Sequence, residues 1–231
     1  MARRTRNYIP DIPYYVALFG NNGEKCLFDA ACLDFYVEHL ITAATAYGVH
    51  VHSYVLVPSR VLFLATPLRE SSLPGMMKSL NASYASFLST FYGRTGTVWR
   101  GRYKSALVQP DEYLLELQRY MEQLPVIEGL VDHPGQYQWS SYSQNSTGAI
   151  RTLNPHNQYL YLGGTLRERC EYYRTFLSSP SQFLWDISAL IAAGRPAATA
   201  DSLRTLEKNL RMTLSVRNKC GRPRKEEHRQ F

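Results

Sequence analysis

Two strand-like runs separated by only two residues constrain the fold more than any other feature of the sequence. Residues 50–57 and 60–66 are dominated by apolar and β-branched side chains, and only Pro58 and Ser59 stand between them. Runs of this kind joined by so short a link are typical of a β-hairpin. The sequence therefore predicts two adjacent antiparallel strands.

Strand and helix patterns alternate on both sides of this hairpin. Before it, residues 14–19 predict a strand closed by a turn at 20–23, and residues 29–47 carry apolar side chains at helical spacing. After it, the pattern predicts a helix over 76–92, a strand over 98–109 and a helix over 111–124. Pro125 is expected to end that last helix, because proline lacks an N–H and disfavours helical backbone in the residue before it.

This order of elements predicts an α+β fold. Two helices on one face of a four-stranded antiparallel sheet form the ferredoxin-like arrangement. Residues 139–164 are rich in Ser, Asn, Gly and Tyr and predict a loop, and 165–216 predict about three short helices. We expect a domain at 1–150, a helical extension at 151–216 and a basic tail at 217–231.

The net charge of +7 lies entirely at the two ends of the chain. Residues 1–7 hold Arg3, Arg4 and Arg6, and residues 217–231 hold six cations against two carboxylates, so that residues 8–216 are neutral. Basic arms on a neutral body suit a polyanion such as nucleic acid. The alternative is that the arms only keep the protein in solution.

Cysteine content and the length of the apolar runs indicate where in the cell the protein is located. Four scattered cysteines without a CxxC pair indicate reduced thiols rather than a disulfide framework or a zinc site. No apolar run approaches the roughly 20 residues of a membrane span, and no signal peptide is expected. We expect a cytoplasmic bacterial protein associated with the nucleoid.

Four segments carry a family resemblance. They are the GNN turn at 20–22, HSYVLVPSRVLFLATP at 52–67, GTVWRGRYKSALVQPDEYLLELQRYMEQLP at 96–125 and GLVDHPGQYQWSSY at 129–142. In this order they resemble the single-tyrosine HUH-type transposases, especially the REP-associated tyrosine transposases of bacteria. The C-terminal segment 153–176 and the terminal GRPRK also resemble that family.

The resemblance implies a nucleophilic tyrosine, two histidines on a strand and a polar residue one helical turn after the tyrosine. The histidines and the polar residue hold a divalent metal that polarises the scissile phosphate, and the tyrosine forms a covalent DNA intermediate. In this sequence the two histidine positions are Arg60 and Leu62, and the polar position is Leu124. None of the three can ligate a metal, so we expect no cofactor and no strand cleavage.

Tyr120 stands at the nucleophile position of the family. It also flanks an apolar stripe of the predicted helix, so it either packs, stacks on DNA or remains a nucleophile. A phenol with an ordinary pKa near 10 and no metal is a poor nucleophile, which favours the first two roles.

An alternative metal site is suggested by the string His50-Val51-His52. Both imidazoles would share one face of a regular strand and bind Mg²⁺ or Mn²⁺, with Gln123 as a further ligand. The string lies one strand too early for the family pattern, however. Histidines at a strand edge that bind no metal are the simpler interpretation.

The predicted strand 98–109 offers a cationic surface. Arg100, Arg102 and Lys104 alternate along it and would project from one face, where they could contact phosphates. Trp99 and Tyr103 have the opposite parity and are expected in the core, unless Gly101 marks a bulge. Arg60 would place a fixed charge where the family holds its metal, and that charge could bind a phosphate. A merely solvated face remains the alternative.

The terminal segment Gly221-Arg222-Pro223-Arg224-Lys225 resembles an AT-hook, whose arginines enter a narrow A·T minor groove. We therefore expect a cleavage-deficient DNA-binding regulator or architectural protein that acts on hairpin or A·T-rich DNA, and the resemblance makes a homodimer plausible. The alternatives are an active transposase with an altered metal site and an interaction protein that has kept only the scaffold.

Overall fold

The computed structural model describes residues 8–109, 112–149, 152–179 and 184–210. Its centre is an antiparallel sheet of four strands in the order β2-β3-β1-β4. The strands are β1 (Tyr14–Phe19), β2 (Val49–Val57), β3 (Arg60–Pro67) and β4 (Lys104–Leu107). The predicted hairpin is confirmed as β2 and β3, and the predicted ferredoxin-like sheet is confirmed with it.

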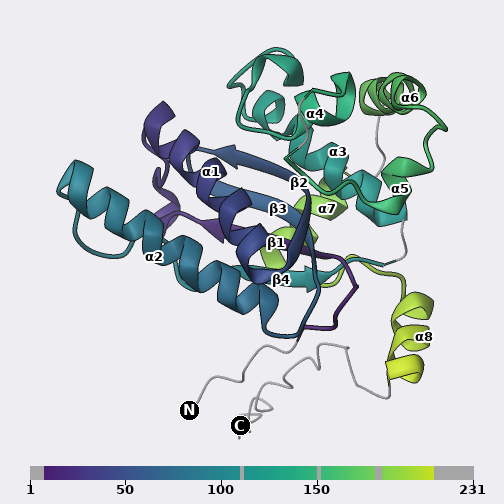
Figure 1. Cartoon of the computed structure of the whole chain (residues 1–231), viewed down its shortest axis with the longest axis horizontal. Helices are drawn as coiled ribbons and strands as arrows, with labels where there is room; N and C mark the ends of the chain where they lie inside the picture. The colour runs from purple at the N-terminus through teal and green to yellow at the C-terminus, as the bar shows by residue number, and fades with distance from the viewer. Residues whose placement is uncertain (1–7, 110–111, 150–151, 180–183, 211–231) are drawn as a thin grey trace, which may run out of the picture.

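Helices cover both faces of this sheet (Figure 1). α1 (Ala30–Tyr47) and α2 (Ser72–Tyr92) pack on one face, which Val16 and Leu18 of β1 share with them. α3 (Glu112–Ile127) and α7 (Leu184–Ala193) pack on the other face, against Tyr15 and Ala17. Because side chains of a strand alternate between faces, β1 contributes to two separate apolar clusters.

The helix predicted at 76–92 begins earlier, at Ser72. Pro74 and Gly75 therefore lie inside its first turn instead of before it. The first four N–H groups of a helix have no partner within the helix, so a proline there loses no hydrogen bond.

The strand predicted over 98–109 is wrong in its first half. Only Lys104–Leu107 pairs with β1, while Trp99 makes a single bridge to Gly20 and the Arg100 amide donates to the Phe19 carbonyl at 2.9 Å. Gly101 has φ of +135°, a backbone conformation that breaks a regular strand. Alternation of side chains consequently cannot be extrapolated from 104 back to 100.

α3 does not end at Pro125 but continues to Ile127. Its end is set by Gly129, whose φ is +67°. The Leu130 amide donates to the Pro125 carbonyl and the Gly129 amide to the Val126 carbonyl, both at 2.9 Å, which is the Schellman arrangement. The glycine cap, rather than the proline, terminates the helix.

The segment 139–164, predicted as loop, contains the short helices α4 (Tyr142–Thr147) and α5 (Asn157–Leu160). The buried residues of α4 include Gln144, Asn145 and Ser146. Because these side chains are polar, the sequence has no apolar periodicity that would predict this helix. Short 3-10 turns lie at Asn21–Gly23 (η1) and Pro134–Gln136 (η2).

The three helices predicted for the C-terminal region are present as α6 (Leu166–Ser178), α7 and α8 (Ala200–Leu210). α7 places Ile187 and Ile191 in the same apolar cluster as β1 and α3. The division of the chain near residue 150 stays a prediction. Among the described residues, no helix has both the length and the apolar character needed to cross a membrane.

Candidate nucleic-acid interface

The positions that the family resemblance singled out come together on the α3 face of the sheet. Arg60 opens β3 and Leu62 follows it on the same face, while Tyr120 and Leu124 come from successive turns of α3. Leu62, Tyr120 and Leu124 belong to one buried cluster, with exposed fractions of 1%, 7% and 0%. Arg60 and Glu128 both act electrostatically on the Tyr120 phenol, so they lie beside it.

The side chains at this locus do not fit a divalent metal. Leu62 and Leu124 have no donor atom, and the Arg60 guanidinium can only donate hydrogen bonds. Glu128, a carboxylate beside Arg60 and Tyr120, is engaged in an ion pair with Arg60. Within the described residues, no group of three or more His, Cys, Asp or Glu side chains is arranged to hold a metal ion.

The environment of Tyr120 does not activate its hydroxyl. Burial raises the pKa of this phenol above its ordinary value of 10. The Arg60 charge lowers that pKa, but the Glu128 charge raises it again. The phenol therefore stays protonated at neutral pH, and the ion pair beside it provides little net charge for its ionisation.

The string His50-Val51-His52 does not form the alternative metal site. A β-bulge between Val51 and Ser53 breaks the alternation, and His50 is exposed whereas His52 is 5% exposed. The ring of His52 lies 2.6 Å from the Asn154 carbonyl oxygen through Nδ1 and 2.8 Å from the Thr66 hydroxyl through Nε2.

Both ring nitrogens of His52 are thus used. Burial lowers the pKa of His52 to about 4, so the ring is neutral and has no lone pair left for a metal. Gln123, the third member of the alternative set, donates its amide N–H to the Leu177 carbonyl at 3.0 Å.

Two cations lie over the ring of Phe19 at the end of β1, and a third is its neighbour on β3. The Arg100 guanidinium lies 5.0 Å and the Lys104 ammonium 5.5 Å from the ring centroid. Arg60 is the register partner of Phe19 across β1 and β3. We call these three residues, Arg60, Arg100 and Lys104, the basic cluster. A cation over an aromatic ring gains about 0.5–1 kcal/mol at an exposed site and stays accessible to solvent.

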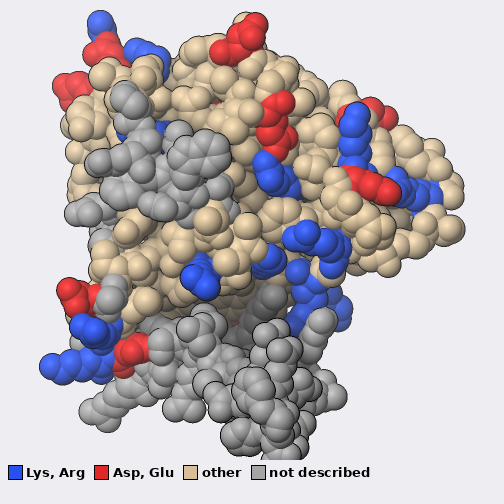
Figure 2. Space-filling model, turned by 180° about the vertical axis from the view of Figure 1, so that it is seen from behind, with Lys and Arg blue, Asp and Glu red and all other residues tan. Residues whose placement is uncertain are grey.

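The basic cluster lies on the same face as Tyr120, because Phe19, Arg60 and Lys104 share the parity of the residues packed against α3. Figure 2, which views the molecule from behind, shows Lys and Arg side chains scattered across the middle of that side. The sequence predicts the three cations, but it does not predict Phe19, over whose ring Arg100 and Lys104 lie, or Glu128, the partner of Arg60.

The remaining predicted site residues are placed as follows. Arg102 is exposed beside the cluster, and Trp99 is buried against Tyr36 and Tyr84, as expected for a core residue. The predicted DNA contacts of both termini lie outside the described residues: Arg3, Arg4, Arg6, Arg222, Arg224 and Lys225.

Comparison with known proteins agrees with this fold. No family model and no curated protein matches the sequence. The structure of a REP-associated tyrosine transposase bound to a REP hairpin superimposes with a TM-score of 0.50 and 13% identity, over 68% of this chain and 92% of that chain. The chain therefore has the fold of a single-tyrosine transposase.

Two further solved structures match less well. A Deinococcus radiodurans protein, provisionally assigned as a transposase, gives a TM-score of 0.37 at 20% identity over 53% of this chain and 97% of that one. The tRNA(His) guanylyltransferase of Saccharomyces cerevisiae gives 0.42 at 10% identity over 78% and 86%.

Proposed function

We propose that this chain binds DNA through the basic cluster and does not cleave it. The observation that carries the proposal is that the Arg60–Glu128 ion pair and two buried leucines, Leu62 and Leu124, occupy the positions where the family resemblance implies metal ligands. They do so on the fold of a single-tyrosine transposase. A fixed guanidinium binds a phosphate by charge and hydrogen bonds but does not polarise it as a divalent metal does.

The arrangement of the basic cluster supports contact with a phosphate backbone. Arg100 is exposed, and Lys104 has three donors, of which one reaches the Ala192 carbonyl. Most protein–DNA contacts go to phosphates and fix the position of the protein without reading sequence. The structural relative at TM-score 0.50 was solved with a DNA hairpin, which makes a hairpin the first ligand to test.

The termini extend this proposal. Arg3, Arg4, Arg6, Arg222, Arg224 and Lys225 are proposed as additional contacts, with the Gly-Arg-Pro-Arg segment in an A·T minor groove. Exposed Arg102 is proposed as a further phosphate contact. A protein that binds in this way and leaves the strand intact acts by occupying or shaping its site, as a regulator or architectural factor does.

Binding is tested by fluorescence anisotropy with a labelled DNA hairpin over a range of salt concentrations. Arg100→Gln and Arg102→Gln are each expected to weaken binding and to reduce the dependence on log salt concentration by about 0.7–0.9, the value for one phosphate contact. Arg69→Gln removes the same charge from the exposed β3–α2 connection and is the matched control. Unchanged affinity in both test variants contradicts the proposed surface.

Cleavage is tested separately, by incubating the protein with the same hairpin and Mg²⁺ or Mn²⁺. The proposal expects no covalent adduct with the wild-type chain. A tyrosyl-DNA product that disappears in Tyr120→Phe would establish an active transposase instead.

A further inference from the structure

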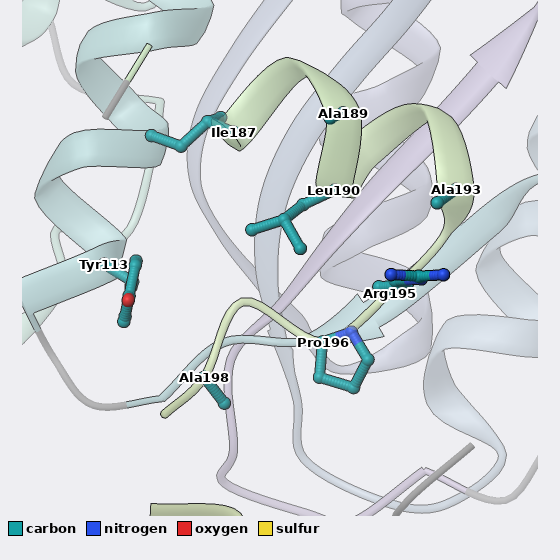
Figure 3. A pocket seen from close by; sticks show the side chains of 8 residues that line it. All are labelled: Tyr113, Ile187, Ala189, Leu190, Ala193, Arg195, Pro196 and Ala198. Carbon is teal, nitrogen blue, oxygen red and sulfur yellow. The ribbon is translucent and has the colours of Figure 1, made fainter. Parts of the chain in front are cut away.

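A pocket of about 510 Å³ lies beside the basic cluster. Its walls come from α7, from the segment that follows α7 and from the first turn of α3. Figure 3 shows Tyr113 and Arg195 on opposite sides of this pocket, with the Leu190 side chain between them. The volume lies within the range of small-molecule sites.

The wall that carries Arg195 is anchored through its backbone. The Tyr15 hydroxyl lies 2.8 Å from the Arg195 carbonyl oxygen and 2.9 Å from that of Leu190, and shares its proton between them. The Arg195 amide donates to the Leu190 carbonyl at 3.0 Å, and Ala197 is bonded to Leu107 at 2.9 Å. These contacts fix the Arg195 backbone, while its side chain remains exposed at the mouth.

The pocket is joined directly to the basic cluster. Gly194 stands between the lining residues Ala193 and Arg195. The side chain of Lys104, a member of that cluster, packs against Gly194, with its Cδ 3.6 Å from the position that a Cβ would occupy there. The Lys104 ammonium also donates to the Ala192 carbonyl at the end of α7. A strand whose phosphates follow the basic cluster therefore passes the mouth of the pocket.

We infer that this pocket binds a nucleotide, with the base between Tyr113 and the apolar side chain of Leu190 and the phosphate on Arg195. The inference rests on the proposed DNA binding, because it assigns the nucleotide to the strand held by the basic cluster. An aromatic ring on apolar walls is the surface on which bases stack. A guanidinium at the mouth supplies the planar pair of donors that a phosphate accepts.

The source of the nucleotide is either a base unstacked from bound DNA or a free mononucleotide. Unstacking costs a few kcal/mol, and it costs least in single strands and hairpin loops. A strand already held by Arg60, Arg100 and Lys104 offers its bases at high local concentration. We therefore assign the pocket to a base of bound single-stranded or hairpin-loop DNA.

The experiment uses the full chain and two photoreactive probes. One is a single-stranded oligodeoxynucleotide carrying 5-iodouracil, and the other is free 5-iodo-dUMP. Irradiation is followed by mass spectrometry of the cross-linked peptides, and oligonucleotide affinity is measured in parallel by anisotropy. With the oligonucleotide we expect an adduct on Tyr113 or on the 187–198 segment.

Three variants test the pocket itself. Ala189→Trp fills it from an exposed lining position of α7, Tyr113→Leu removes the stacking ring, and Arg195→Gln removes the charge. Ala189→Trp is expected to abolish the adduct, and each variant to weaken oligonucleotide binding about fivefold, the lower end of the effect of one stacked base. Arg69→Gln again controls for charge, and the thermal midpoint verifies folding of each variant.

The outcomes separate this inference from the proposed function. If the oligonucleotide binds and the pocket variants bind it as tightly as the wild type, with no adduct in the pocket, the inference is wrong and the DNA-binding proposal stands. If no DNA binds, the DNA-binding proposal fails, and the free mononucleotide 5-iodo-dUMP tests the pocket by itself. An adduct in the pocket that Ala189→Trp abolishes supports a nucleotide site, and the absence of such an adduct overturns it.

Discussion

Arg60, at the start of β3, forms an ion pair with Glu128, which follows α3, and both charges act on the phenol of Tyr120. The side chains of the pair are 27% and 24% exposed, so water screens their attraction. Partly exposed pairs of this kind contribute about 0–1 kcal/mol to stability. The ion pair therefore contributes little to the stability of the fold, and Arg60 can readily exchange its partner. A phosphate can compete with the Glu128 carboxylate for the Arg60 guanidinium.

The first prediction follows from that competition. Glu128→Gln leaves Arg60 without its anion, so affinity for a DNA hairpin is expected to rise severalfold, while Arg60→Gln is expected to lower it. Stability should change by less than about 1 kcal/mol in either variant. Anisotropy titrations and urea unfolding measure the two quantities. Equal affinity of wild type and Glu128→Gln would show that Arg60 does not contact DNA.

The second prediction restores the ligands that the resemblance implies. In the triple variant Arg60→His, Leu62→His and Leu124→Asn, three donor atoms replace a guanidinium and two aliphatic side chains. Without metal the variant should be less stable by several kcal/mol, because Leu62 and Leu124 are buried and an unpaired polar group there costs about 1–3 kcal/mol. Mn²⁺ should then raise its thermal midpoint but not that of the wild type.

A wild-type midpoint that rises equally with Mn²⁺ would place a metal elsewhere in the protein. The double variant Arg60→His with Leu62→His, which leaves Leu124 in place, is the matched control, because it supplies one ligand fewer. Its midpoint should respond less to Mn²⁺ than that of the triple variant.

The sheet could be predicted from sequence because each of its signals is local. The two-residue link at Pro58 and Ser59 fixes the hairpin. The apolar runs on either side of it form β2 and β3, whose side chains pack on the α1 face and on the α3 face of the sheet. The convergence of Arg60, Leu62, Tyr120 and Leu124 followed from the resemblance, and the structure places them together.

The details that were missed depend on contacts between distant segments. Arg100 reaches the α3 face because its backbone bonds to Phe19 and its side chain lies over that ring, not because a strand continues to it. Proline chemistry suggested an end for α3 at Pro125, but the hydrogen bonds of Gly129 and Leu130 override it. The burial of Glu122 likewise depends on α4 and α6, two helices with weak or polar patterns.

The third prediction concerns the cap of α3. Gly129 has φ of +67°, and a Cβ added there would meet nothing within 4 Å, so the cost of a side chain is conformational only. Gly129→Ala is expected to lower the free energy of unfolding by about 1 kcal/mol. Gly129→Asn should cost less, because asparagine tolerates the left-handed region. Urea unfolding compares the three proteins, and equal stability of all three would contradict this account of the helix end.

The fourth prediction concerns Glu122, a fully buried carboxyl of α3. It accepts hydrogen bonds from Ser141 at 2.6 Å, Asn145 at 2.9 Å and Tyr173 at 2.8 Å. Burial nevertheless raises its pKa from 4.5 to about 7. The folded state therefore keeps a proton that the unfolded state loses, and Glu122 makes stability fall as the pH rises from about 4.5 to about 7, by on the order of 3 kcal/mol.

Glu122→Gln should remove this contribution, so that the stability of the variant relative to wild type increases as the pH rises through that window. Chemical unfolding at several pH values measures it. Glu38→Gln, which changes an exposed carboxyl on α1, is the control and should follow the wild-type profile.

The fifth prediction concerns His52, which acts in the opposite direction over nearly the same window. Burial, together with smaller effects of the nearby His156 and His50, lowers its pKa from 6.5 to about 4. The unfolded state takes up a proton first as the pH falls, so the stability that His52 contributes is lost between about pH 6.5 and 4. Between pH 4.5 and 6.5 the contributions of His52 and Glu122 therefore oppose each other.

This opposition gives a sharp expectation. In His52→Gln only the contribution of Glu122 remains, so the stability of this variant should fall as the pH rises. In Glu122→Gln only the contribution of His52 remains, so the stability of that variant should increase as the pH rises. The stability of the double variant should be nearly independent of pH in this window. The same holds for the wild type as far as these two residues are concerned, because their contributions cancel. His50→Gln, which changes an exposed ring two residues away, is the matched control. Parallel pH profiles for His52→Gln and Glu122→Gln would refute the assignment of these two buried groups, because their protons must then come from elsewhere in the chain.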